Sequence, residues 1–192
     1  MIIVVKELTA DDRNRLRTGF MVRMDRSDDP LWRNFWETEV LFLDGREGEA
    51  VTRLHDLAQS ENRNVALAAL MSLGEWYEHS GSIDNARKVY EQAAEKHVDT
   101  PSTLLARASI ARLHNKEAQP GRAIALLEEI AATIDSAPAD VVQFIAAEYC
   151  EALRRLGRFE DARAFFRRVT TLFPNHTELM LLEQHFLGNS NT

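Results

Sequence analysis

The side chains of this chain that are able to do chemistry are six histidines, one cysteine and 30 acidic residues. A helical zinc pair needs two histidines four residues apart. No two of the six have that spacing; they are His55, His79, His97, His114, His176 and His185. Cys150 has no histidine near it in the sequence that would activate its thiol. No serine lies in a nucleophile-elbow motif, and the dispersed glycines form no phosphate-binding loop. The sequence therefore predicts no enzyme, no cofactor and no metal site.

Composition narrows the class of protein further. The chain has 192 residues, a net charge of -7, 45% hydrophobic and 28% charged residues, which predicts a folded protein. Its 8 glycines and 5 prolines are few, and this favours long helices over a turn-rich β fold. An acidic balance disfavours binding along a nucleic-acid backbone. The apolar run at residues 1–5 is too short for a signal-peptide core, and no transmembrane segment occurs, so we expect a cytoplasmic location.

Caps and turn residues divide the chain into about ten helices. Thr9, Asp29 before Pro30, and Ser60 are candidate N-caps, and Asn175 with Glu178 resembles a capping box for the last helix. The connections have two to five residues, so consecutive helices are expected to be antiparallel neighbours in one domain over residues 1–192. Residues 1–6 have the composition of a short strand, which predicts either a loosely docked tail or an edge strand.

A spaced pattern recurs along the chain. Its anchor alanines are Ala50, Ala86, Ala123 and Ala162, separated by 36, 37 and 39 residues. The second copy is the clearest; its pattern residues are Leu73, Gly74, Tyr77, Gly81, Ala86, Tyr90 and Ala93. The fourth copy repeats this frame and closes at Pro174, whereas the third departs from it at His114 and Pro120.

This pattern resembles the tetratricopeptide repeat, a helix–turn–helix unit of 34 residues. The resemblance covers residues 31–174 and implies an all-α solenoid, or α-α superhelix, of about four hairpins. Residues 1–30 would add an N-terminal tail and helix, and residues 175–192 a C-terminal capping helix and tail. Small residues at Gly74, Ala111 and Cys150 would let paired helices approach closely, with Cys150 a buried, inert thiol. The aromatic side chains of Tyr77, Tyr90, Phe159 and Phe166 would fill the space between hairpins.

In this family the first helices of successive hairpins line a groove that holds a partner peptide or helix. Carried over position by position, the groove residues are Trp32, Phe35, Glu39, Phe42, Met71, Glu75, Glu78, His79, Arg112, Asn115, Lys116, Phe144, Glu151, Arg154 and Arg155. The resemblance therefore implies a non-catalytic scaffold or adaptor for a protein partner, with the basic members receiving an acidic segment. The alternative is that these positions are ordinary solvated helix faces.

Two other functions remain open from the sequence. Six arginines between Arg154 and Arg168, interleaved with phenylalanines, superficially suggest RNA stacking. The last helix is apolar over more than one face, which fits self-association or partner docking, as in an oligomerising accessory subunit of an enzyme complex. The alternative for that helix is packing against the fourth repeat alone.

Overall fold

The computed structural model describes residues 8–96 and 101–187, and regular structure in them is entirely helical. The all-α class predicted from the sequence is confirmed. The helices are α1 (Ala10–Asp25), α2 (Pro30–Leu43), α3 (Glu47–Ala58), α4 (Arg63–His79), α5 (Ile83–Lys96), α6 (Pro101–Lys116), α7 (Pro120–Ala131), α8 (Ala139–Arg155), α9 (Phe159–Leu172) and α10 (Thr177–Leu187). A short 3-10 turn, η2 (Ile134–Ser136), follows α7. The expected strand or tail at residues 1–6 lies outside the described residues.

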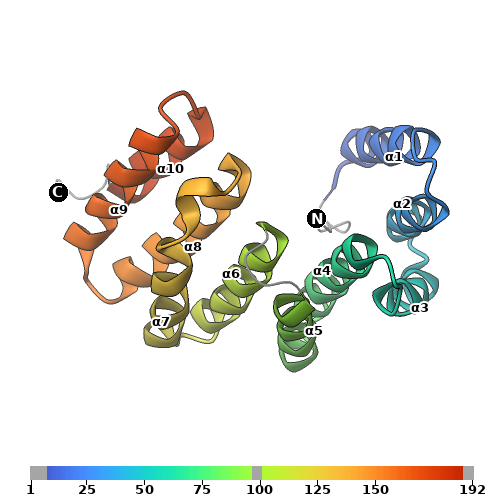
Figure 1. Cartoon of the computed structure of the whole chain (residues 1–192), viewed down its shortest axis with the longest axis horizontal. Helices are drawn as coiled ribbons and strands as arrows, with labels where there is room; N and C mark the ends of the chain where they lie inside the picture. The colour runs from blue at the N-terminus through green and yellow to red at the C-terminus, as the bar shows by residue number, and fades with distance from the viewer. Residues whose placement is uncertain (1–7, 97–100, 188–192) are drawn as a thin grey trace. The chain divides into compact units, whose positions relative to one another are not determined.

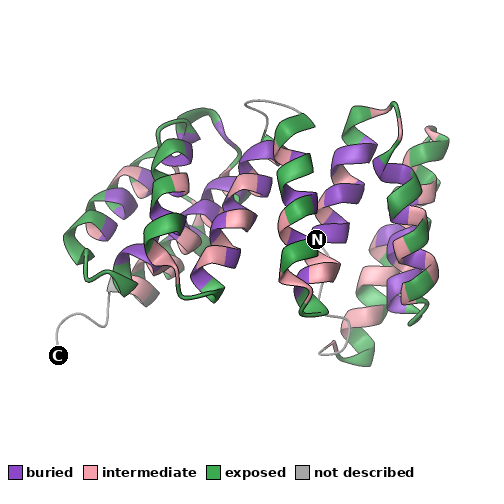
Figure 2. Ribbon diagram, turned by 90° about the horizontal axis from the view of Figure 1, so that it is seen from below, coloured by how far each residue is buried: buried purple, intermediate pink, exposed green. Residues whose placement is uncertain are grey.

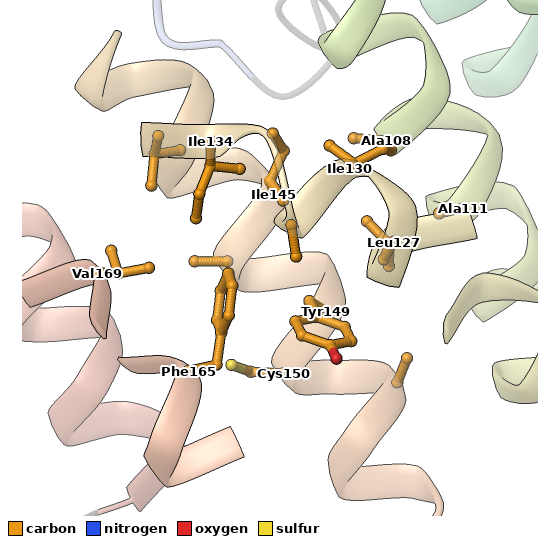
Figure 3. Close-up of a cluster of buried hydrophobic side chains, with 14 of the residues drawn as sticks. Ala108, Ala111, Leu127, Ile130, Ile134, Ile145, Tyr149, Cys150, Phe165 and Val169 are labelled. Carbon is orange, nitrogen blue, oxygen red and sulfur yellow. The ribbon is translucent and has the colours of Figure 1, made fainter. Parts of the chain in front are cut away.

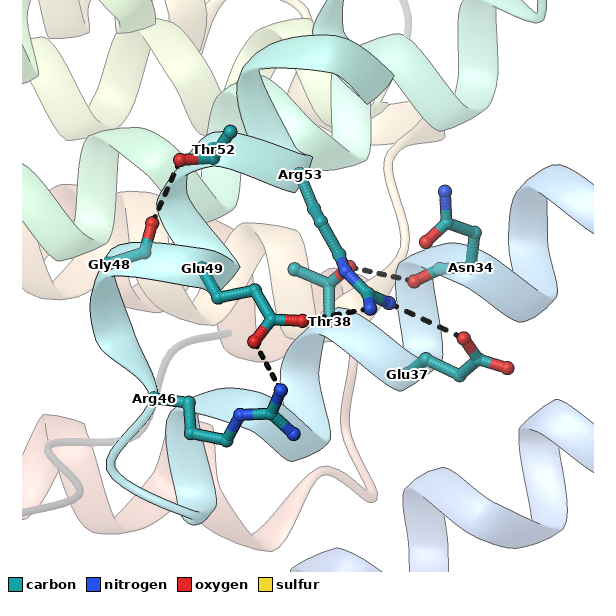
Figure 4. A network of polar contacts seen from close by, with 8 residues as sticks. All are labelled: Asn34, Glu37, Thr38, Arg46, Gly48, Glu49, Thr52 and Arg53. Atoms are coloured by element: carbon teal, nitrogen blue, oxygen red, sulfur yellow. Dashed lines mark hydrogen bonds and ion pairs between the residues drawn. The ribbon is translucent and has the colours of Figure 1, made fainter.

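The chain forms two compact units, Met1–Lys96 and His97–Thr192. In the first unit each helix packs against the next, from α1 through α5, and α2 also contacts α4 (Figure 1). Its core includes Leu54, Leu70, Leu73 and Tyr90, all fully buried. Arg53 on α3 ties α3 to α2, because its guanidinium lies 3.5 Å from Glu37 of α2; within α3 it also lies 2.9 Å from Glu49 (Figure 4).

The second unit is built in the same way. Helix α6 packs against α7 and α8, α7 against α8, and α8 against α9, while α10 covers α8 and α9. One apolar cluster runs through these helices; Figure 3 labels Leu127, Ile130, Ile145 and Phe165 among its members. Buried positions lie on the inner sides of the helices and exposed ones outside (Figure 2). Helices α4 and α6 have no exposed residue between Val65 and Glu78 or between Ser102 and Asn115, so the neighbouring helices cover them and each hairpin depends on its neighbours for a core.

Local signals explain where most helices begin. Thr9 caps α1 by accepting a hydrogen bond from the Asp12 amide, and Asp29 caps α2 through the amide of Leu31. Two predicted caps are wrong. Asn62, not Ser60, caps α4, because its side chain accepts from two amides of the first turn. At α10 the Leu179 amide donates to Nδ1 of His176, so His176 replaces Asn175 as the capping side chain.

Four tight turns sit at equivalent places, five residues before the anchor alanines. Gly45, Gly81 and Gly157 have φ of 73°, 79° and 71°, and the third turn holds Ala118 at φ 56°. The four anchor alanines are all buried. The recurrence predicted from the sequence is therefore present in the backbone, including the copy that departs most from the pattern.

Most predicted packing roles hold, with one correction. Cys150 is fully buried, and burial raises the pKa of its thiol, so the thiol stays protonated and inert. Tyr90 and Phe166 are fully buried as expected. The prediction for Phe159 is wrong: it is 45% exposed, because it is the first residue of α9, at the tip of the α8–α9 turn. The expectation of one domain over 1–192 stays a prediction.

Candidate functional site

In the second unit, α6 and α8 bring together the predicted groove residues of that unit. We call this surface the α6–α8 face and define it by Arg112, Asn115, Lys116, Phe144, Glu148, Glu151, Arg154 and Arg155. The guanidinium carbon of Arg112 lies 5.0 Å from the centre of the Phe144 ring, in cation–π geometry. Arg112 and Phe144 are both partly exposed, and Lys116 is exposed. A cation resting on an aromatic ring is thus presented at the surface by two helices.

Asn115 holds the two helices of this face in register. It is only 3% exposed, and its Nδ2 donates to the backbone oxygen of Glu148 at 3.0 Å and to the Glu148 carboxylate at 3.1 Å. Arg155 donates back from α8 to the backbone oxygen of Asn115. The predicted groove residue Asn115 is therefore a structural link between α6 and α8 in this structure, with only its edge open to solvent.

Glu151 organises the basic end of the face. Arg154 donates to it twice, at 2.9 and 3.0 Å, and Arg155 donates at 2.6 Å. Burial alone would raise the pKa of Glu151, but the hydrogen bonds and charges of the two arginines hold it below its ordinary value. Four cationic side chains stand against two carboxylates on this face. Its net charge is therefore +2, on a chain whose total is -7.

In the first unit, the equivalent positions lie on α2 and α4. Trp32, Met71 and Glu75 are partly exposed, and His79 is exposed. Four other predicted groove residues are buried instead; they are Phe35, Glu39, Phe42 and Glu78. Phe35 packs edge-on against Trp32 and Trp36, with ring centres 5.6 and 5.0 Å apart. The predicted aromatic row is mainly a core cluster that reaches the surface at its Trp32 edge.

The two buried glutamates of this unit are hydrogen-bonded. Glu39 is 4% exposed and accepts from the Ser72 hydroxyl at 2.8 Å, and Tyr90 donates to Glu78 at 3.2 Å. Burial, with a smaller contribution from the nearby charge of Glu75, raises the pKa of Glu39 to about 7, although the Ser72 hydrogen bond lowers it. Glu39 therefore keeps its proton to a higher pH than an ordinary glutamate, and its buried side chain is not available to a partner at the surface.

The basic stretch from Arg154 to Arg168 is largely neutralised within the chain. Arg158 pairs with Asp161 at 2.6 Å and Glu128 at 3.3 Å. Arg163 pairs with Glu160 at 3.1 Å, and Arg168 with Asp135 at 2.5 Å. Phe165 and Phe166 are buried. Five of the six arginines of this stretch thus already pair with carboxylates, and Phe159 is its one exposed ring, so the stretch is poorly suited to stacking with a nucleic acid.

Sequence reasoning missed two residues of these surfaces. Glu148 accepts a hydrogen bond from Asn115 across the α6–α8 face. It lies four residues after Phe144 and three before Glu151, so all three residues are on one side of α8. Trp36 stacks between Phe20 and Trp32, with ring centres 5.9 Å from each. Its spacing from Trp32 (i+4) was the available signal.

Within residues 8–96 and 101–187, no group of three or more His, Cys, Asp or Glu side chains could hold a metal ion. None of the helices in that part is long and apolar enough to cross a membrane. Two shallow depressions, of about 300 and 380 Å³, lie in the separate units. The first is lined by Leu70, Gln92 and Lys96, and the second by Tyr149, Phe165 and Arg168. Neither one contains a nucleophile beside a base.

Comparison with known proteins supports the repeat assignment. A family model described as the tetratricopeptide repeat matches residues 68–100 and 151–176, which fall on the α4–α5 and α8–α9 hairpins. Two crystal structures of nearly identical TPR-like repeats from a candidate kinesin light chain of Podosopora anserina, one of them a variant, superpose with a TM-score of 0.55. Each is 19% identical, over 84% of this chain and 85% of that one. No curated protein matches the sequence. The helical-repeat fold predicted from the sequence is confirmed.

Proposed function

Since this chain is a tetratricopeptide-repeat protein, we propose that it is a non-catalytic scaffold whose α6–α8 face binds an acidic segment of a partner protein. The repeat generally mediates protein–protein interactions. The proposal includes the cytoplasmic location expected from the sequence. The finer assignment, to one face and one charge class of partner, rests on the side chains of the second unit.

The observation that carries the proposal is the placement of Arg112 over Phe144 at the centre of a face with net charge +2. The ring limits the freedom of the guanidinium before any partner arrives, so less conformational entropy is lost when a carboxylate binds it. Lys116 and Arg154 extend the same positive potential along both helices. Such a field speeds the encounter with an acidic segment and disfavours a basic one.

Hydrogen bonds and ion pairs hold the backing of this face in place, and a partner does not need to break them in order to bind. Asn115 and Glu148 are committed to each other, and Glu151 holds the two neighbouring arginines. The exposed members are therefore presented on a rigid backing. An extended peptide lying across α6 and α8 would meet Lys116 and Arg112, then the edge of Phe144.

The test measures fluorescence anisotropy of a labelled acidic peptide, with glutamates spaced around one aromatic residue, titrated with the full chain. We expect saturable binding that weakens at least tenfold in an Arg112→Glu, Lys116→Glu double variant. Arg163→Glu is the matched control, because this arginine lies on α9, outside the face, and pairs with Glu160. It should bind as the native chain does.

The choice of peptide supplies the second comparison. A peptide of the same length with lysines in place of glutamates should bind at least tenfold more weakly than the acidic one. Circular dichroism of each variant establishes that the helices are retained. Equal binding of the two peptides, or equal loss in Arg163→Glu and in the double variant, would show that the α6–α8 face does not select an acidic partner.

A further inference from the structure

The N-terminal cap of α10 differs chemically from the caps of earlier helices. Thr9, Asp29 and Asn62 cap α1, α2 and α4 through side-chain oxygens. At α10 the acceptor is Nδ1 of His176, 3.3 Å from the amide nitrogen of Leu179. A ring nitrogen accepts a hydrogen bond only while it carries no proton, because both nitrogens of the cationic imidazole are donors. Histidine is the side chain whose charge ordinarily changes between pH 5 and 8, so a modest change of pH can remove this cap.

A proton on His176 would act on α10 in two ways. The amide of Leu179 would lose its acceptor, and a positive charge would stand at the end of the helix where the macrodipole is itself positive. Glu178 in the first turn would attract the cation and offset part of this cost. The two effects together weaken the docked helix on the order of tenfold.

Helix α10 depends on its contacts for its structure. It has 11 residues, and isolated helices of that length are marginal in water. Leu179 is fully buried, and Leu182 and Phe186 pack against the apolar cluster of the second unit. The ring centre of Phe186 lies 6.0 Å from that of the fully buried Phe166 on α9. The residue that donates the cap bond, Leu179, is thus also the one that anchors the helix in the core.

The surroundings of His176 leave its ring open to protons from solvent. The side chain is partly exposed, and within the described part of the chain it forms no ion pair. Helices α8 and α9 are joined by a tight turn at their other ends, so the start of α8 and the end of α9 lie near the start of α10. The charged residues there are Glu178 on α10, Arg167 and Arg168 on α9, Asp140 on α8 and Asp135 on η2, the last paired with Arg168. Charges of both signs are therefore mixed around the cap.

We propose that His176 is a pH-sensitive switch that controls the docking of α10. At neutral pH and above, the unprotonated ring caps α10 and the helix covers the apolar side of α8 and α9. Near pH 5 the protonated ring no longer caps it, and the fraction of molecules in which α10 has left α8 and α9 rises on the order of tenfold. This device goes beyond the proposed function, since no residue of the α6–α8 face takes part.

Amide hydrogen exchange of the full chain at pH 7.5 and 5.0 tests the switch. The rates are expressed as protection factors, relative to an unstructured peptide at the same pH, so that the intrinsic effect of pH is removed. We expect the protection of the α10 amides to fall at least fivefold at pH 5.0, whereas that of α6 in the same unit should change less than twofold. Equal protection of α10 at the two pH values would overturn the proposal.

Three variants assign the effect to one side chain. His176→Asn keeps an acceptor at either pH, so α10 should stay protected at both. His176→Ala has no acceptor, so the protection of α10 should be low at both. His185→Asn, on the same helix, is the matched control and should keep the pH dependence of the native chain. Circular dichroism establishes that each variant is folded. A pH dependence that survives in His176→Asn, or that disappears in His185→Asn, would show that His176 is not the switch.

Discussion

Gly74 on α4 and Tyr90 on α5 are in such close contact that a β-carbon at position 74 would overlap the Tyr90 ring. A β-carbon on Gly74 would lie 2.2 Å from Cε1 of Tyr90 and 2.6 Å from two further atoms of the ring. Tyr90 is fully buried, and its hydroxyl donates to Glu78. The aromatic ring therefore lies against the backbone of α4, and this contact sets the distance between the two helices of the hairpin.

Gly74→Ala is expected to destabilise the chain, because the methyl group requires Tyr90 or the helix backbone to move. Overpacking of this kind costs about 1–3 kcal/mol. Urea denaturation followed by circular dichroism gives the free energy of unfolding. Gly19→Ala is the matched control: it also lies inside a helix, its nearest contact would be Arg23 at 3.9 Å, and it should stabilise by about 0.5–1 kcal/mol. Equal effects at both positions would contradict the close contact.

Ala118→Gly is expected to stabilise the chain. Ala118 has φ of 56°, the left-handed region, at the turn where the other three hairpins have glycine. That conformation costs a non-glycine residue about 1–2 kcal/mol, partly offset by the larger chain entropy of glycine when unfolded. We expect a net gain on the order of 0.5–1 kcal/mol in thermal or urea denaturation. The reverse change, Gly81→Ala, should lose a similar amount; a stabilising Gly81→Ala would refute the equivalence of the turns.

The stability of the chain is expected to depend on Glu39 between about pH 4.5 and 7. The pKa of Glu39 is raised by burial from 4.5 to about 7, so the folded state retains the proton longer than the unfolded state does. Its contribution is full below pH 4.5 and is lost as the pH rises through 7. The loss is on the order of 3 kcal/mol by pH 8.

Glu39→Gln removes this titration while preserving an acceptor for Ser72. We expect the variant to be more stable than the native chain at pH 8 and similar to it at pH 4.5. Glu37→Gln, an exposed carboxylate on the same helix, is the control and should leave the shape of the curve unchanged. Parallel stability curves for the native chain and Glu39→Gln from pH 4.5 to 8 would mean that Glu39 ionises normally.

The helices and turns of this protein were predictable because they depend on local signals. Thr9, Asp29 and the glycines of three turns act on the backbone next to them, wherever the rest of the chain lies. The exceptions are also local. Ser60 and Asn62 are both residue types that cap helices, and they lie two residues apart. The sequence does not distinguish them; in the structure the helix begins directly after Asn62.

The exposure of the groove residues was less predictable. Periodicity shows which side of a helix is apolar, but not how deeply the neighbouring hairpin covers it. Phe35 and Phe42 were expected at the surface, and the packing of α2 against its neighbours buries both. Glu39 lies between them, one turn from each, and was buried with them. In the second unit Arg112 of α6 and Phe144 of α8 remain partly exposed to solvent.

The central claim, that the α6–α8 face receives an acidic segment, is tested most directly by NMR titration of the ¹⁵N-labelled chain with the acidic peptide. We expect saturable shift changes in the amides of α6 and α8 and in the Arg112 side chain, reduced by added salt. The basic peptide should leave them unchanged. Shift changes confined to α9 and the α8–α9 turn, with α6 and the Arg112 side chain unaffected, would contradict it.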